Sequence, residues 1–203
     1  MRKIMKRLLV LPLLVFFLFV VGLVKDHNAL CDGLIRLHVV ASSDGIEDQK
    51  IKLSVRDLVL NSLSDAMEDM TDIEQAKDYI RSHVPQLEAA INETLHRLGV
   101  EQTAVVQFLE EEFSARNYET FSLPSGLYQS LRVVIGEGSG KNWWCVVFPA
   151  MCLEATTDYV EDVAAGAGFS SELTSSLTGE EGYEIRFFLL DVLGKIENFF
   201  HLS

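Results

Sequence analysis

The sequence is poor in basic residues, and this shortage excludes one large class of function. Its 203 residues contain 17 Lys and Arg against 30 Asp and Glu. Five of the basic residues lie at or before Lys25, where no acidic residue occurs, so the rest of the chain has 12 basic against 30 acidic residues, or −18. Such a chain lacks the positive surface that binds nucleic acid or an anionic lipid surface through bulk charge. We therefore expect no nucleic-acid partner.

The sequence also lacks a phosphate-binding loop, although "GEGSGK" (136–141) resembles one. A Walker loop has four residues between its first Gly and its Gly-Lys pair, which Ser or Thr follows. Here three residues separate Gly136 from Gly140, and Asn142 follows Lys141. The segment also joins two predicted strands, so it does not open a helix whose N-terminus would bind an anion. We interpret it as the turn of a β-hairpin.

Spacings typical of a metal or catalytic site are missing as well. Cys145 and Cys152 are too far apart for a zinc knuckle, and no His pair accompanies them. The sequence has no Gly-x-Ser-x-Gly nucleophile elbow, and His38 beside Ser42 and Asp44 is more typical of a packing residue on a strand. We therefore expect no enzymatic activity, no metal or other cofactor, and no small-molecule substrate.

The first 25 residues have the composition of an export signal. Four basic residues precede Leu8–Val24, a run without any charge. The possible cleavage sites Val20–Gly22 and Ala29–Cys31 are both imperfect, so residues 1–25 are interpreted as either a signal peptide or an N-terminal membrane anchor. Basic residues before an apolar run favour a cytoplasmic N-terminus and an exported, secreted or anchored, remainder.

Hydrophobic periodicity predicts that residues 33–203 form a single exported domain. Strands that cluster after helices indicate an α+β fold, with a mainly antiparallel β-sheet and helices packed on one face. The segment 156–182 is acidic and rich in Ser and Gly, which is typical of a mobile loop. The expected elements are a strand at 33–42, a helix from the Ser43–Asp44 cap to Met67, a helix from the Thr71–Asp72 cap to Leu98 kinked or split at Pro85, strands at 103–113, 127–136 and 142–148, a short helix near 159–165, a strand at 183–188 and a helix at 189–203.

The segment that contains both tryptophans also contains two of the three cysteines. A disulfide between Cys145 and Cys152 suits an oxidising environment, with Pro149 turning the chain between them. Two buried free thiols are the alternative, and Cys31 is left over if the bond forms. On a strand, Trp143 and Trp144 point to opposite faces, so one can fill the core while the other meets a partner. Burial of both is equally compatible with the sequence.

Polar residues in or beside strongly apolar segments mark a candidate partner-contact surface, because a purely structural sequence has little need of them there. At the first strand–helix junction the candidates are Arg36, His38, Asp44, Gln49 and Arg56. Around the glycine turn they are Arg132, Glu137, Lys141, Asn142 and one of Trp143 or Trp144.

Two blocks of the sequence resemble the stage II sporulation protein R family. They are "IRLHVVASSDGIEDQKIKLSVRDLVL" (Ile35–Leu60) and "LPSGLYQSLRVVIGEGSGKNWWCVVFPAMC" (Leu123–Cys152). The final "YEIRFFLLDVLGKI" (Tyr183–Ile196) is similar to the family's closing strand and helix. The departures are small: Ser42 stands where the family usually has Asn, and Ala150 where a second Pro is common.

The resemblance implies a role that composition does not show. In endospore-forming bacteria the family's protein is made in the forespore and exported into the space between the two septal membranes. There it signals to a membrane-embedded aspartic protease, which then processes the sigma-E precursor. The implied protein is therefore a signalling ligand of that protease and not an enzyme. The alternatives are an exported cell-wall hydrolase and a structural protein of the septum.

Overall fold

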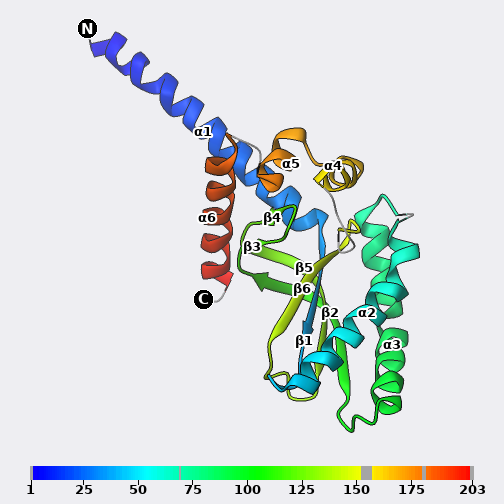
Figure 1. The fold of residues 1–203 in the computed structure, drawn as a ribbon. Helices are drawn as coiled ribbons and strands as arrows, with labels where there is room; N and C mark the ends of the chain where they lie inside the picture. The colour runs from blue at the N-terminus through cyan, green and yellow to red at the C-terminus, as the bar shows by residue number, and fades with distance from the viewer. Residues whose placement is uncertain (1, 69, 152–156, 180–181, 202–203) are drawn as a thin grey trace.

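A computed structural model describes residues 2–68, 70–151, 157–179 and 182–201. Four strands form one mixed sheet in the order β2-β5-β1-β6, and two short strands, β3 and β4, form a separate pair. Figure 1 shows α2 and α3 along one side of the sheet, whereas α1, α4, α5 and α6 gather at its end. The elements are α1 (Arg2–Gly33), β1 (Ile35–Val40), α2 (Ile46–Glu68), α3 (Ile73–Arg97), β2 (Ala104–Phe113), β3 (Arg116–Asn117), β4 (Ser122–Leu123), β5 (Gly126–Ile135), β6 (Asn142–Phe148), α4 (Thr157–Gly166), α5 (Ser171–Thr178) and α6 (Glu184–His201).

The predicted fold class is confirmed, since the structure is α+β and most strand pairs are antiparallel. The predicted β-hairpin is wrong. β1 lies between β5 and β6, pairs parallel with β5, and pairs antiparallel with β6. All six residues of β1 are buried, because neighbouring strands and packed side chains surround it on every side. The loop 136–141 therefore crosses over the end of β1 instead of closing a tight turn.

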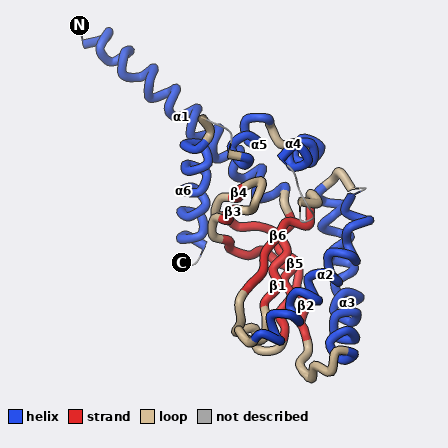
Figure 2. Tube along the Cα trace, in the orientation of Figure 1, coloured by secondary structure: helices blue, strands red, loops and turns tan. Residues whose placement is uncertain are grey.

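One hydrophobic core lies between the sheet and the helices α2 and α3. The side chains of Ile35, Leu37 and Val39 point to this face from β1, and alternate residues of β5 join them. From the helices, residues at helical spacing such as Val55, Val59, Ile80 and Ile91 fill the other side of this layer. The helix α3, which was predicted to be kinked or split at Pro85, runs unbroken through this residue. Figure 2 shows the strands of the main sheet, β2, β5, β1 and β6, as one block with this helix pair on one side.

A second core lies at the end of the sheet where β1 begins. It joins the buried side chains of Leu30 on α1, Tyr128 on β5 and Leu190 on α6, together with Leu173 and Leu177 on α5. This arrangement corrects two predictions. Residues 183–188 were expected as a strand, but all except Tyr183 belong to α6. The expected loop 156–182 contains α4, as the short helix near 159–165 predicted, and also α5, whose N-cap is Ser170.

The helix α1 has two parts with different surroundings. From Val10 to Val20 its side chains are exposed or nearly so, whereas Leu23, His27, Leu30 and Cys31 are buried in the second core. Among the described residues, one helical segment, Val10–Gly33, is long and apolar enough to cross a membrane. The exposed part fits the predicted signal peptide or transmembrane segment, and the last turns of α1 belong to the folded domain.

Candidate functional site

Four polar or aromatic residues form a row across the sheet on the face opposite α2 and α3. His38 on β1 is paired with Arg132 on β5 and with Trp144 on β6, and Arg132 is paired in turn with Gln107 on β2. Since residues directly opposite on neighbouring strands share a face, these four side chains lie side by side. The register thus brings together three of the predicted contact residues.

His38 and Arg132 share one carboxylate, that of Glu111. The His38 Nδ1 donates to Glu111 Oε1 over 2.9 Å, and the Arg132 Nη1 lies 3.7 Å from the same oxygen. Burial alone would raise the pKa of Glu111, but the hydrogen bond from His38 and the charges of His38 and Arg132 outweigh it, so this pKa lies below its ordinary value. Glu111 therefore remains ionised and neutralises part of this basic row.

Arg36 lies in the next row of the same face and is completely buried. Its guanidinium carbon lies 3.9 Å from the centre of the Phe113 ring and 4.9 Å from that of Tyr128, and one terminal nitrogen donates to the Tyr118 hydroxyl over 3.0 Å. The Nε and Nη1 atoms of Arg36 have no hydrogen-bond partner among the described residues, nor have His38 Nε2 and Glu111 Oε2. Such a concentration of unpaired buried polar atoms is unusual in a purely structural core.

Part of this face is open to solvent. Val105 on β2 is 51% exposed, Gln107 is exposed, and the Arg132 side chain is 38% exposed. The guanidinium of Arg116, on β3, lies 3.6 Å above the Trp144 ring. Aromatic and arginine side chains beside exposed apolar residues are typical of protein interfaces. We call these residues (Val105, Gln107, Arg116, Arg132, Trp144) the sheet-face surface.

A second group of predicted contact residues meets where the loop 136–141 crosses the end of β1. The Asp44 carboxylate accepts from the Lys141 backbone N–H at 2.8 Å. The Gln49 side chain donates to the Ser43 carbonyl and accepts from Lys52, which also donates to the Lys141 carbonyl. These polar side chains hold the loop in place, while Glu137 in the loop and Asn142 at the start of β6 remain exposed. The sheet therefore brings the two predicted contact regions together.

The two tryptophans lie on opposite faces, and each is half-buried. Trp143 packs on the core beneath α2, with the Arg56 guanidinium 5.1 Å from its ring centre. Arg56 is thus placed away from the sheet-face surface, on the α2 side. Trp144 stacks on His38 with ring centres 5.5 Å apart. Of the two, Trp144 is the one that belongs to the candidate surface.

The predicted disulfide lies only partly within the described residues. Cys145 is buried at the centre of β6, and Cys152 lies outside the described residues, so their bond stays a prediction. Cys31 is a buried free thiol near the end of α1. Side chains of metal-ligand type, which the sequence did not suggest, meet there: His27 and Cys31 on α1 and Glu197 on α6.

Sequence reasoning missed Gln107, Glu111 and Arg116, although all three contribute to or border the sheet-face surface. Glu111 is the middle residue of an acidic run, "EEE", within a predicted strand. A carboxylate that a strand buries on one face of a sheet needs a hydrogen-bonding or basic partner. That signal indicates a buried ion pair but does not identify His38, because strand register is set by the whole sheet.

Comparison with known proteins agrees with this architecture. The model of the family described as "Stage II sporulation protein R (spore_II_R)" matches residues 31–158, a range that includes every strand. A stage II sporulation protein R from Bacillus subtilis (strain 168) is 30% identical, over 92% of this chain and 97% of the relative. No solved structure matches the chain significantly.

Proposed function

Because the chain belongs to the stage II sporulation protein R family, and so has a role in sporulation, we propose that it is an exported signalling protein. It is made in the forespore, enters the space between the septal membranes, and activates a membrane-embedded aspartic protease. That protease then processes the sigma-E precursor. In this proposal the chain is a ligand that does no chemistry of its own.

The observation that carries this proposal is the extent of the match, which covers the whole sheet and nearly the full length of the Bacillus subtilis relative. The exposed apolar part of α1 supports export, because it is preceded by basic residues and is followed directly by the folded domain. A membrane helix fused to a compact domain also suits a partner that lies in a membrane.

We further propose that the protease contacts the sheet-face surface and the neighbouring loop 136–141. Both regions expose polar groups on a fixed backbone. Strand pairing holds the backbone of the sheet, and hydrogen bonds to Asp44 and Lys52 hold that of the loop. A rigid surface loses little conformational entropy on binding, which favours recognition. The exposed apolar residues of α6, including Phe188 and Phe200, form a second surface that a partner could contact instead. The experiment below compares the two surfaces.

The experiment is co-expression of the chain, the protease and the sigma-E precursor in a host that does not sporulate, with precursor cleavage as the readout. The full chain should cause cleavage and its omission should abolish it. Arg132→Ala should lower the apparent affinity for the protease at least tenfold, since interface anchors contribute about 2 kcal/mol or more. Arg97→Ala, an exposed arginine on α3, is the matched control and should have no effect.

Two outcomes would contradict this proposal. Cleavage that does not depend on the chain would remove its role as an activator. Release of fragments from purified cell wall by the chain, lost in His38→Ala, would favour the hydrolase alternative instead. If Arg132→Ala leaves cleavage unchanged while Phe188→Ala lowers it, the contact surface lies on α6.

A further inference from the structure

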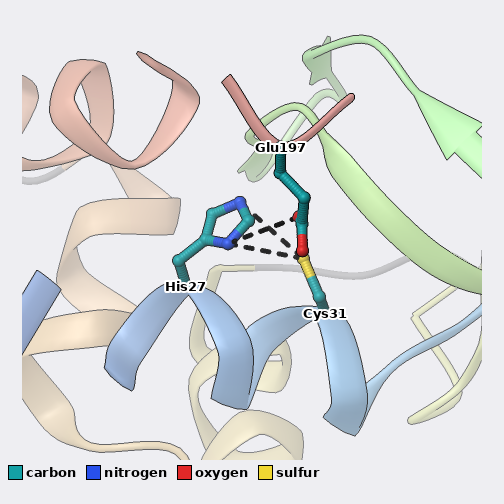
Figure 3. Close-up of side chains that lie close together, drawn as sticks. All are labelled: His27, Cys31 and Glu197. Atoms are coloured by element: carbon teal, nitrogen blue, oxygen red, sulfur yellow. Dashed lines mark hydrogen bonds and ion pairs between the residues drawn. The ribbon is translucent and has the colours of Figure 1, made fainter. Parts of the chain in front are cut away.

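The last turns of α1 and the middle of α6 bring together three side chains of different ligand types. His27 and Cys31 stand four residues apart, on one face of α1, and Glu197 reaches them from α6. Figure 3 shows the imidazole, the sulfur and the carboxylate converging on one point between the two helices. The ligand atoms all lie within 4.8 Å of one another.

The imidazole of His27 is held in the orientation and tautomer that a metal ligand needs. Its Nε2 lies 3.0 Å from the carbonyl oxygen of Ser125, so this nitrogen carries the proton and donates it there. The Nδ1 atom is then left with a free lone pair, and it lies 3.9 Å from Glu197 Oε2 and 3.9 Å from Cys31 Sγ, which is also 3.8 Å from Nε2. A second ring nitrogen bonded to a backbone carbonyl is the usual support of a metal-bound histidine.

The Ser125 carbonyl is itself fixed by the surrounding structure. The Asp191 carboxylate on α6 accepts from the Ser125 N–H at 3.0 Å and from its hydroxyl at 2.6 Å. Gly194 allows α6 to approach, since a Cβ at that position would lie 1.6 Å from the Ser125 oxygen. Gly126 similarly leaves space for sulfur, because a Cβ there would lie 2.7 Å from Cys31 Sγ. Backbone and side chains thus preserve the space around the cluster.

Strong hydrogen bonds among the three side chains do not account for the cluster. The 3.9 Å between His27 Nδ1 and Glu197 Oε2 is too long for a hydrogen bond between nitrogen and oxygen. Cys31 Sγ lies 3.9 and 3.8 Å from the two nitrogens of the His27 ring, and a thiol is only a weak donor. Glu197 Oε2 is buried and has no hydrogen-bond partner among the described residues. Around a tetrahedral zinc ion, nitrogen and sulfur ligands stand about 3.5 Å apart, which is slightly less than the 3.8–3.9 Å between Cys31 Sγ and the His27 nitrogens.

We infer that His27, Cys31 and Glu197 bind a zinc ion that fastens α6 to the end of α1. One nitrogen, one sulfur and one carboxylate oxygen suit zinc, whereas calcium and magnesium take oxygen ligands. The thiol loses its proton on binding, as metal-bound cysteines do. Three protein ligands leave the fourth position of the zinc ion to water, and Glu197, whose side chain is 40% exposed, is the ligand residue nearest to solvent.

The test uses the full chain in detergent micelles, with Co²⁺ as a spectroscopic probe and Zn²⁺ as competitor. The wild type should bind one Co²⁺ per chain with a thiolate-to-metal charge-transfer band, and Zn²⁺ should displace it. Cys31→Ser should abolish the band and lower the Zn²⁺ affinity by about 100-fold or more, and Glu197→Gln should lower it about tenfold or more. Glu184→Gln, on the exposed start of α6, is the matched control and should bind as the wild type does.

Thermal unfolding provides a readout that does not depend on the probe. Zn²⁺ should raise the unfolding temperature of the wild type and of Glu184→Gln, because a ligand of the folded state alone stabilises it. It should not raise that of Cys31→Ser, whose fold is checked by circular dichroism. A wild type without the charge-transfer band or the zinc-dependent shift, or a band that persists in Cys31→Ser, would overturn the inference. None of these outcomes depends on the proposed signalling role.

Discussion

Arg36 is a buried cation whose surroundings are aromatic. No carboxylate of the described residues lies within ion-pair distance of it, and two of its three nitrogens lack hydrogen-bond partners. A buried charge without an ion-pair partner costs free energy, and even buried ion pairs can often be replaced by apolar side chains of similar volume without loss of stability. Stability alone therefore does not explain an arginine here, and we propose that its position beside the sheet-face surface gives it a role in partner binding.

We expect Arg36→Met to leave the free energy of unfolding unchanged or to raise it by about 1–2 kcal/mol. Precursor processing should fall, because the Tyr118 hydroxyl and the rings of Phe113 and Tyr128 lose the group that organises them. Urea unfolding followed by tryptophan fluorescence measures the first effect, and the co-expression assay measures the second. A loss of several kcal/mol with unchanged processing would show that Arg36 has only a structural role.

Glu111 should make the stability of the protein depend on pH on the acid side. Its pKa is held below the ordinary value of 4.5, so the ionised form stabilises the folded state above that pH, and this contribution is lost as the pH falls through the lower folded-state pKa. Glu111→Gln should therefore be less stable than the wild type at neutral pH, by about 1–2 kcal/mol. The difference should shrink as the pH falls below about 4. A difference that is the same at both pH values, in urea unfolding, would contradict this assignment.

At the scale of the elements, periodicity identified most strands and helices correctly but did not give their neighbours. The alternation of Gly126–Ile135 and Asn142–Phe148 shows that both are strands, and a short glycine-rich connection normally implies that they pair. They do not, because β1 is inserted between them. β1 is completely buried because it lies at the centre of the sheet. The sequence does not reveal this position, because Arg36 and His38 on one face of the strand are typical of a face exposed to solvent.

The C-terminal helix shows a different limit. In "YEIRFF" the alternation of polar and apolar residues favours a strand, yet residues from Glu184 onward are helical. The helix is fixed by contacts that lie far away in sequence, such as those of Asp191 with Ser125 and of Arg186 with Asp26. Local propensity is overruled by such tertiary contacts. For the same reason no sequence pattern joined Glu197 to the ligands on α1.

The loop 136–141 should tolerate very little added volume. A Cβ at Gly140 would lie 2.2 Å from the carbonyl oxygen of Ser43, which is backbone and cannot simply rotate away. We expect Gly140→Ala to lower the free energy of unfolding by about 2 kcal/mol or more. Gly166→Ala, at the end of α4, is the control, since nothing lies within 4 Å of its added Cβ. It should be neutral or stabilising by up to about 1 kcal/mol, and equal effects of the two changes would contradict the tight packing of the loop.

At the scale of the whole molecule, the chain consists of a sheet domain with two cores, and α1 joins one of these cores to the exposed apolar segment that fits a signal peptide or a membrane anchor. The sequence indicated the export segment and the domain separately, with the domain beginning at residue 33. Packing shows that the connection is continuous, because helix α1 runs without interruption from the exposed apolar part into the second core. A partner bound in the membrane would therefore find the domain at a fixed orientation, which a flexible linker could not provide.

This continuity predicts where the chain can be cut. Burying an apolar side chain of this size contributes about 1.5–3 kcal/mol, and α1 supplies Leu23 and Leu30 as well as Cys31 to the second core. Removing all three would cost about 5 kcal/mol or more, which is comparable with the whole stability of an ordinary domain. A chain that begins at Leu23 should therefore unfold in one cooperative transition, whereas a chain that begins at Leu34 should lose that transition and expose the second core. Tryptophan fluorescence in urea and binding of a hydrophobic dye measure both effects.

If export removes a signal peptide, mass spectrometry of the exported protein should find its first residue at or before Leu23. Cleavage after Cys31 with full signalling activity, or a stable chain without α1, would show that the last turns of this helix are dispensable to the domain.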